Sequence, residues 1–281
     1  MDSSLTKDIH FMNPNRLVSV AIPAPTDDQK KQPVMVLVHG FSASTFEFEA
    51  FKSAVQEKVP SVLFSSVIMG GHGEDYHAFK SATFADWLAP ITQEVTALAE
   101  LGYSRIFLFG VSTGATGILH ELITGRYEDV PINHVFLMDT FIQPVDNRLH
   151  ALPVLKHVVT NTHSGAVTPI EKRHWYVNRP TAALLELLTL IKRVRARLKQ
   201  PLGGTDVDMT LFTAEFDPVG RSSGTTTIAS YFPKARVVRY ESNRHVIIES
   251  MTPSDWNNND QRHFDAVIEV IESVIQNKNN L

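Results

Sequence analysis

The residues best placed to do chemistry lie in one pentapeptide, Gly-Val-Ser-Thr-Gly at positions 110–114. It follows a predicted strand at 104–109 and leads into a predicted helix at 112–124. A serine between two glycines, at a sharp turn from strand to helix, is typical of a nucleophile elbow, which lifts the hydroxyl above the sheet edge. Side chains at the glycine positions would clash in so tight a turn. Ser112 is the candidate nucleophile; the alternative is a glycine-rich loop whose serine only caps the helix.

A serine hydroxyl needs a base within hydrogen-bond reach and a third group that orients the base. Among twelve histidines, His245 stands out because it lies five residues after the predicted strand 237–240. That is past the carboxyl end of a strand, where open α/β sheets bind ligands. An imidazole with a pKa near ~6.5 can accept and return a proton at neutral pH. Nine others have no distinguishing context: His10, His77, His120, His134, His150, His157, His163, His174 and His263.

The orienting acid should lie between Ser112 and His245 in the chain, also past the end of a strand. Asp217 fits, because it follows the predicted strand 209–213 and precedes a proline. Two rivals remain open. Glu215 lies two residues earlier, and Asp139 ends the predicted strand 135–139.

Stabilising an oxyanion requires backbone N–H donors. One should come from Thr113, which follows the candidate nucleophile at a helix N-terminus, where the dipole favours negative charge. The second should lie in the loop after the predicted strand 34–38, and the N–H of Phe41 is the natural donor. Gly40 lets the backbone turn in close. We expect His39 to brace this loop rather than act as a second base.

Other chemistry finds little support. The glycine-rich run 70–73 follows the predicted strand 62–69 but lacks the spacing of a phosphate-binding loop. His72 within it is not accompanied by a second ligand at metal-binding spacing. The chain has no cysteine, which excludes disulfides, a thiol nucleophile and Cys-ligated metal sites.

Strands and helices alternate along the chain, which predicts an α/β fold with a mostly parallel, doubly wound sheet. Thr83 and Asp86 have the form of a capping box at the start of a helix that runs to about Leu101. The remaining predicted elements are an opening hairpin (9–12 and 17–22), helices at 46–59 and 264–275, and the strands given above.

One segment interrupts the alternation. We assign residues 1–140 and 206–281 to the core and 141–205 to an inserted helical cap, because no convincing strand lies between 139 and 206. Apolar residues at helical spacing predict an amphipathic helix at 180–198. An ordinary packing helix is the alternative. The apolar stripe of the helix at 180–198 could also line an acyl pocket.

Composition bounds the function. At 281 residues the chain can form one large domain with an insert, and 43% hydrophobic residues are ordinary for a globular protein. A net charge of −4 and a pI near 6.3 predict no broad basic surface for nucleic acid. The basic cluster at 192–199 fits a solvated helix face. The polar N-terminus has no apolar signal region, and no apolar run reaches the ~20 residues of a membrane span. We therefore expect a cytoplasmic protein without stable membrane insertion, and make no prediction of its oligomeric state.

Four motifs occur in one order: Val-His-Gly-Phe at 38–41, Gly-His-Gly at 71–73, the elbow at 110–114, and Asp217 followed by His245. In this order they resemble the α/β-hydrolase superfamily, over residues 34–250. The run 83–87 and the sequence Ser-Asn-Arg-His-Val at 242–246 are similar to bacterial carboxylesterases and monoacylglycerol lipases. This resemblance implies hydrolysis of esters of an acyl chain and a small alcohol, through an acyl-enzyme and without a cofactor.

Two features depart from that group. Thr113 stands where the group usually has Met or Leu, which would change the wall of the acyl pocket, and the predicted cap is longer than in the shortest members. A thioesterase, lactonase, C–C bond hydrolase, peptidase or acyltransferase could use the same machinery. A non-catalytic relative that binds a ligand is the alternative from another class.

Overall fold

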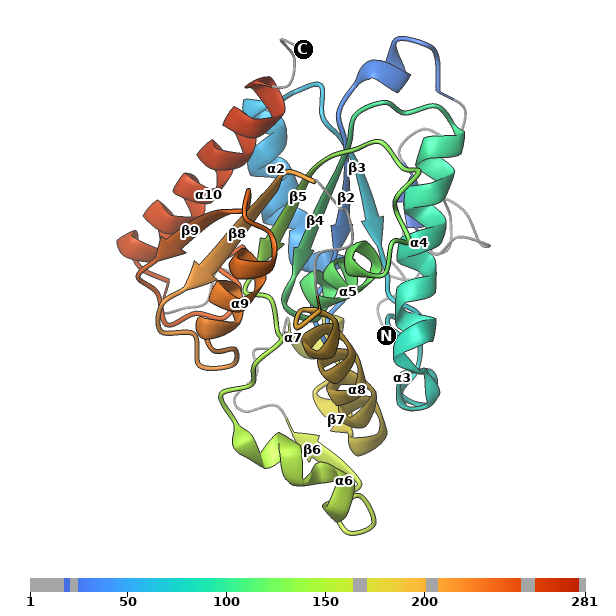
Figure 1. Ribbon diagram of the computed structural model, residues 1–281, viewed down its shortest axis with the longest axis vertical. Coiled ribbons are helices and arrows are strands. Elements are labelled where there is room, and N and C mark those ends of the chain that lie inside the picture. Colours follow the sequence, from blue (N-terminus) through green and yellow to red (C-terminus); the bar gives the residue numbers. More distant parts are fainter. Residues whose placement is uncertain (1–17, 21–24, 164–170, 201–206, 249–255, 278–281) are drawn as a thin grey trace.

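The protein is built on a seven-stranded sheet, seen in a computed structural model that describes residues 18–20, 25–163, 171–200, 207–248 and 256–277 (Figure 1). The strand order is β1-β3-β2-β4-β5-β8-β9. Only β1 is antiparallel to its neighbour, so the mostly parallel sheet predicted from the sequence is confirmed. The strands are β1 (Val18–Val20), β2 (Val34–Val38), β3 (Leu63–Val67), β4 (Ile106–Val111), β5 (Ile132–Met138), β8 (Met209–Ala214) and β9 (Arg236–Tyr240).

Helices cover both faces of this sheet (Figure 1). In β2, Val36 belongs to one hydrophobic cluster and its neighbours Met35 and Leu37 to the other. A strand buried on both faces reads as a continuous apolar run, which is why no alternation is visible at 34–38. The first cluster includes α4 (Phe84–Glu100), α5 (Ser112–Ile123), α8 (Thr181–Arg197) and α9 (Ser223–Tyr231); the second includes α2 (Glu49–Lys58) and α10 (Asn258–Asn277).

Capping explains where two of the helices begin. The predicted capping box is confirmed: Asp86 accepts the Thr83 N–H at 2.8 Å, and the Thr83 hydroxyl accepts the Asp86 N–H at 3.3 Å. The last helix begins six residues earlier than predicted. Asn257 accepts the Asp260 N–H at 3.1 Å, and Asp260 in turn accepts the Asn257 N–H at 3.1 Å. The apolar stripe at 264–275 does not extend into this polar first turn, so the stripe alone predicts a later start. The sequence pattern predicts neither α3 (Tyr76–Ser81) nor α9.

The segment between β5 and β8 extends beyond one end of the sheet (Figure 1). The expectation that it holds no strand is wrong, because β6 (Asn161–His163) and β7 (Asn178–Pro180) form an antiparallel pair. These three-residue strands carry no apolar alternation, so their sequences give no strand signal. Thr181 ties the pair to α8 by donating its hydroxyl to the Val159 carbonyl at 2.6 Å. The segment also contains η3 (Asn147–Ala151), α6 (Leu152–Leu155) and α7 (Glu171–His174), and its boundaries as a cap stay a prediction.

Two further expectations concern the ends of the chain and the membrane. The first strand of the predicted opening hairpin, 9–12, lies outside the described residues, and the second appears there as β1. Within the described ranges, no helix is long and apolar enough to cross a membrane.

The junction between β4 and α5 is held by close backbone packing. Ser112 has a left-handed backbone, with φ of 50°. A Cβ at Gly110 would lie 2.8 Å from the Cα of Ala115, so the expected clash across the turn is confirmed there. A Cβ at Gly114 would lie 2.3 Å from the carbonyl oxygen of Val38, on the neighbouring strand. The second glycine therefore lets the helix approach β2.

Replacing Gly114 by alanine should lower the free energy of unfolding by about 1–3 kcal/mol or more, because backbone atoms cannot give way to the methyl group. Gly117→Ala in the same helix is the matched control. Its Cβ would meet only side-chain ends, that of Leu88 at 2.6 Å and that of Ile91 at 3.6 Å. Alanine is favoured over glycine in a helix interior by about 1 kcal/mol, which offsets that contact. Urea denaturation of the two variants should separate them, and equal losses of stability would contradict the close approach.

Candidate active site

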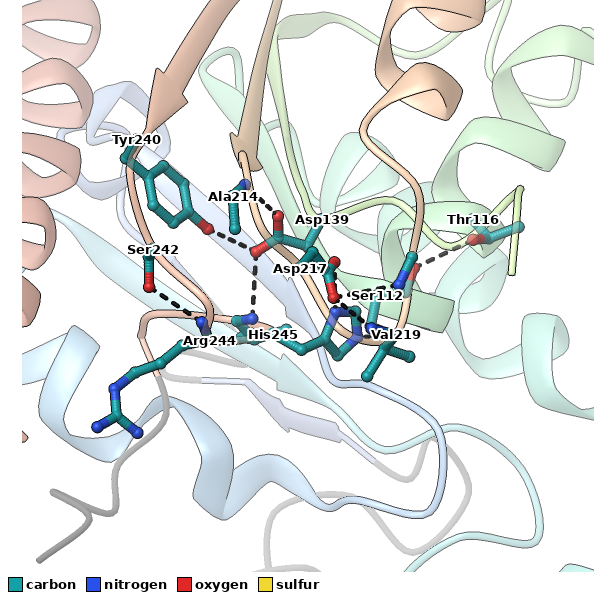
Figure 2. Close-up of polar contacts among 12 residues, drawn as sticks. Ser112, Thr116, Asp139, Ala214, Asp217, Val219, Tyr240, Ser242, Arg244 and His245 are labelled. Carbon is teal, nitrogen blue, oxygen red and sulfur yellow. Dashed lines mark hydrogen bonds and ion pairs between the residues drawn. The ribbon is translucent and has the colours of Figure 1, made fainter. Parts of the chain in front are cut away.

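Ser112 and His245 meet at the carboxyl edge of the sheet. Ser112 is the first residue of α5, and His245 lies on the loop after β9. The Ser112 Oγ and the His245 Nε2 are 2.8 Å apart (Figure 2). The left-handed backbone of Ser112 is a conformation that non-glycine residues adopt at a cost of about 1–3 kcal/mol, typically where the site requires it. The elbow thus directs the hydroxyl at the imidazole rather than into the helix.

Asp217 reaches the other nitrogen of the same ring. Its Oδ2 lies 2.8 Å from the His245 Nδ1. A carboxylate only accepts hydrogen bonds, so this contact places the ring proton on Nδ1 and leaves Nε2 free to accept the Ser112 O–H. The three side chains form one hydrogen-bonded chain, in which each donor faces an acceptor.

The Asp217 carboxylate is itself fixed by backbone amides. Its Oδ1 accepts the N–H of Val219 at 2.7 Å (Figure 2) and that of Gly220 at 3.1 Å. This is the local hydrogen bonding expected of an aspartate that starts a turn. Glu215, a rival in the sequence, is exposed, and within the described residues its side chain makes no hydrogen bond with His245.

Asp139, the other rival, lies near these three side chains, but it forms hydrogen bonds with the surrounding loops and strand ends and not with the His245 ring. Its Oδ1 accepts the Ala214 N–H at 2.7 Å, and its Oδ2 accepts the Tyr240 hydroxyl at 2.5 Å (Figure 2). The same Oδ2 accepts the Val246 N–H at 3.1 Å. Asp139 therefore connects the ends of β8 and β9 to the residue after His245. Burial raises the pKa of this carboxyl to about 6, reinforced by the charge of Asp217 and opposed by His245 and the hydrogen bonds.

The charges around His245 favour its protonated form. Burial lowers the pKa of His245, but the hydrogen bond and charge of Asp217 outweigh burial, and the charges of Asp139 and Glu47 act in the same direction. The net result is a pKa above the ordinary value. A ring that holds a proton more tightly is a stronger base toward a hydroxyl.

The two expected oxyanion donors lie on elements that the elbow brings together. Thr113 is the second residue of α5, and Phe41 follows Gly40 in the loop after β2. The packing of Gly114 against the Val38 carbonyl sets the first turn of α5 beside that loop. The Thr113 side chain is buried, and its Oγ1 has no hydrogen-bond partner among the described residues. Its effect on an acyl pocket stays a prediction.

His39 braces the Phe41 loop, as the sequence suggested. Its Nδ1 lies 2.8 Å from the Gly40 carbonyl oxygen, and its Nε2 accepts the Met69 N–H at 3.1 Å. Burial lowers the pKa of His39 to about 4, opposed by the bond to Gly40, so the ring is neutral at pH 7. His72 packs its ring near those of His39 and Phe41, with centroids 5.1 Å and 6.4 Å away.

The segment between β5 and β8 contacts the same loop from outside. The Tyr176 N–H donates to the Ser42 carbonyl at 2.8 Å, and its hydroxyl donates to the Glu74 carbonyl at 2.7 Å. The His174 ring stacks on Phe46, with centroids 3.6 Å apart. Tyr176 carries no signal in the sequence, because tertiary packing alone brings it to this loop.

The sequence also does not predict Tyr240 and Glu47 as residues of this site. Tyr240 ends a predicted strand at the expected edge, and that position was its only signal. Glu47 is a buried acid in a segment expected to be helical, which a single sequence does not distinguish from an exposed one.

A groove elsewhere on the described part of the molecule does not coincide with this site. This groove, of about 770 Å³, is lined by residues of α4, α5 and α8, among them Leu88, His120 and Arg193, and Ser112 and His245 are not in its lining. In the part of the chain that the structure describes, no cluster of three or more His, Cys, Asp or Glu side chains could hold a metal ion. The assignment of the site therefore rests on the hydrogen-bonded contacts of Ser112, His245 and Asp217.

The sheet order, the elbow after β4 and the histidine after the last strand define the α/β-hydrolase fold. Solved structures agree. A monoacylglycerol lipase from Paleococcus ferrophilus superposes with a TM-score of 0.65 at 13% identity, covering 87% of this chain and 96% of that one. A soluble variant of monoglyceride lipase from Saccharomyces cerevisiae, in complex with a substrate analogue, gives 0.65 at 12% identity, covering 91% and 89%. At such identities the likeness concerns the fold.

In sequence the chain resembles the thermostable monoacylglycerol lipase of Bacillus sp. strain H-257. It is 26% identical over 168 residues, which are 58% of this chain and 64% of the relative. The chain thus matches less than two thirds of that relative's length. No protein-family model matches the chain.

Proposed function

We propose that the protein is a serine hydrolase that cleaves carboxylic esters through an acyl-enzyme. The observation that carries the proposal is the chain from Ser112 Oγ through His245 to Asp217, with two contacts of 2.8 Å. It supplies the three parts that hydroxyl attack requires: a nucleophile, a base and a group that orients the base. The curated monoacylglycerol lipase relative favours an ester as the substrate.

In the first half of the proposed reaction, His245 removes the proton of Ser112 as the oxygen attacks the ester carbonyl. Asp217 stabilises the imidazolium that forms. The N–H groups of Phe41 and Thr113 donate to the oxyanion, and the N-terminus of α5 favours its charge. The tetrahedral intermediate then collapses, His245 gives its proton to the leaving alcohol, and the acyl group stays on Ser112.

In the second half, the departed alcohol leaves space for water beside His245. The ring accepts a proton from this water, which attacks the acyl carbon under the same two N–H donors. Collapse of the second intermediate breaks the bond to Ser112, whose oxygen takes the proton back, and releases the carboxylic acid. The residues end in their starting protonation states, so the proposed cycle needs no cofactor.

We infer that the substrate joins an acyl chain to a small alcohol, as the relative's name indicates for that protein. The inserted segment at 141–205 is proposed to act as a cap over the site. Its support is local: Tyr176 contacts Ser42 in the loop that carries Phe41, and His174 stacks on Phe46 in the 3₁₀ turn that follows. The expected cytoplasmic location and the absence of stable membrane insertion stay predictions.

Other hydrolases and acyltransferases could use the same residues. A panel of p-nitrophenyl esters, thioesters, lactones and aryl amides separates these chemistries by their relative kcat/KM. A non-catalytic, ligand-binding protein is the alternative from another class, and it predicts no turnover of any member of the panel.

Ser112→Ala should abolish both covalent labelling and hydrolysis. A fluorophosphonate reacts with an activated serine, so the wild type should be labelled and the variant should not. Hydrolysis of a short-chain p-nitrophenyl ester should fall by at least about 10³-fold. Ser104→Ala, on the solvent-exposed side of the chain before β4, is the control and should behave as the wild type. Equal labelling of wild type and Ser112→Ala would refute the assignment of the nucleophile.

Asp217→Asn and Asp139→Ala should fail in different ways. In Asp217→Asn the amide oxygen can still accept the Val219 N–H, so stability should change by less than about 1 kcal/mol, while kcat should fall by about 10³–10⁴-fold through loss of the charge and the tautomer. Asp139→Ala leaves the buried N–H groups of Ala214 and Val246 without an acceptor, which should cost about 2–4 kcal/mol of stability. Steady-state kinetics measures kcat, and urea denaturation measures the free energy of unfolding, for each of the two variants.

Glu215→Gln is the matched control for these two variants, because Glu215 is exposed and close in sequence. It should keep wild-type kcat and stability. Full activity of Asp217→Asn would remove Asp217 from its proposed role and leave Asp139 or Glu215 as the acid.

A further inference from the structure

Glu47 is a buried acid that the proposed reaction does not use. It lies in the 3₁₀ turn Thr45–Phe48, and only 4% of the residue is exposed, whereas Glu49 two residues later faces solvent. A carboxylate is rarely buried unless hydrogen bonds or charges compensate for its lost hydration. At Glu47 this compensation is a backbone amide: the Oε2 accepts the Gly40 N–H at 2.7 Å.

This contact fixes the peptide that precedes Gly40. The peptide that follows is held as well, because the Gly40 carbonyl oxygen lies 2.8 Å from His39 Nδ1 and accepts the Ala43 N–H at 3.3 Å. In a planar trans peptide the N–H points opposite to the C=O. The partners of the Gly40 carbonyl therefore direct the Phe41 N–H away from themselves. Glu47 therefore fixes Gly40, the residue that joins these two peptides.

Glu47 also lies beside the reacting groups. A Cβ built on Gly40 would be 3.5 Å from Glu47 Oε1 and 3.5 Å from the Ser112 Cβ, so both side chains lie on the side of Gly40 where a Cβ would project. Burial raises the pKa of Glu47 to about 7, opposed by the Gly40 N–H and by the charge of His245. The influence is mutual, because the charge of Glu47 contributes to the raised pKa of His245.

We propose that Glu47 is a positioning residue of the site: its carboxylate holds Gly40 so that the Phe41 N–H faces the oxyanion, and its charge acts on His245. This inference rests on the proposed ester hydrolysis. Three acids then face the imidazole from different elements. Asp217 touches the ring from the loop after β8, Asp139 holds the adjacent Val246 from the end of β5, and Glu47 lies behind Gly40 on the β2 side.

Two substitutions separate the two roles of Glu47. Glu47→Ala removes the acceptor of the Gly40 N–H. The kcat for a short-chain ester should fall by about 10–100-fold, which is less than the loss expected when one oxyanion donor is removed entirely. KM should change by less than about 3-fold. Glu47→Gln keeps an acceptor oxygen for the Gly40 N–H but loses the charge. Its kcat at alkaline pH should stay within about 3-fold of the wild type.

The pH dependence of kcat/KM tests the second role of Glu47, the effect of its charge on His245. His245 must be neutral to act as a base, so activity rises as pH passes its pKa. Removing a nearby negative charge lowers that pKa. In Glu47→Gln the acid limb, which is the rise of kcat/KM with increasing pH, should therefore move to lower pH by about 0.5 unit. The midpoint of this limb belongs to the coupled groups rather than to one residue. Glu49→Gln, on the exposed surface beside Lys52, is the control and should leave the limb unchanged.

Each outcome decides a different claim. Unchanged kcat in a folded Glu47→Ala protein overturns the hold on Gly40. If this variant does not fold, which thermal denaturation reports, an unmoved acid limb in Glu47→Gln overturns the proposal instead. Wild-type protein without Ser112-dependent hydrolysis overturns the proposed function and this inference with it, whereas active wild type with indifferent Glu47 variants overturns the inference alone.

Discussion

The close approach of α5 to β2 is the contact on which the rest of the site depends. Gly114 lies against the carbonyls of Val38 and His39, where a methyl group would overlap backbone atoms. Because two backbones meet here without a side chain between them, the first turn of the helix is set beside the loop after β2. The N–H groups of Thr113 and Phe41, which come from different elements, are thereby brought to one edge of the sheet. The left-handed backbone of Ser112 then points its hydroxyl toward the same edge.

His245 is surrounded by acids that differ in how they reach it. Asp217 bonds the ring directly, Asp139 bonds the backbone of the next residue, and Glu47 lies behind the glycine that lines the nucleophile. Burial alone would favour a neutral ring, yet the combined charges raise its pKa. The balance matches a base that becomes positively charged during a proton transfer, and it depends on hydrogen bonds that keep each carboxyl in its place.

Much of this arrangement could be predicted from the sequence, because it depends on local signals. The apolar run at 34–38, the glycines at 110 and 114 and the capping box at Thr83 each act over a few residues. Sequence order along an alternating α/β chain then placed Asp217 and His245 at one edge, and the structure brings both into contact with each other.

What could not be predicted depends on tertiary packing. The burial of Glu47, the bond from Tyr240 to Asp139 and the contact of Tyr176 with Ser42 join residues distant in the chain, by geometry that no local pattern encodes. The short pair β6–β7 has no apolar alternation, so its strands are set by pairing and by Thr181 rather than by their own composition. A rival acid such as Asp139 could be separated from Asp217 only by seeing which one touches the ring.

The central claim is that Ser112 attacks a carbonyl whose oxygen is held by Phe41 and Thr113. A crystal structure of the protein after reaction with a p-nitrophenyl alkylphosphonate tests it directly, because the tetrahedral phosphorus mimics the intermediate. We predict a covalent bond from phosphorus to the Ser112 Oγ, with the phosphoryl oxygen about 3 Å from the backbone nitrogens of both Phe41 and Thr113. An adduct on another side chain, or a phosphoryl oxygen turned away from both N–H groups, would contradict the account.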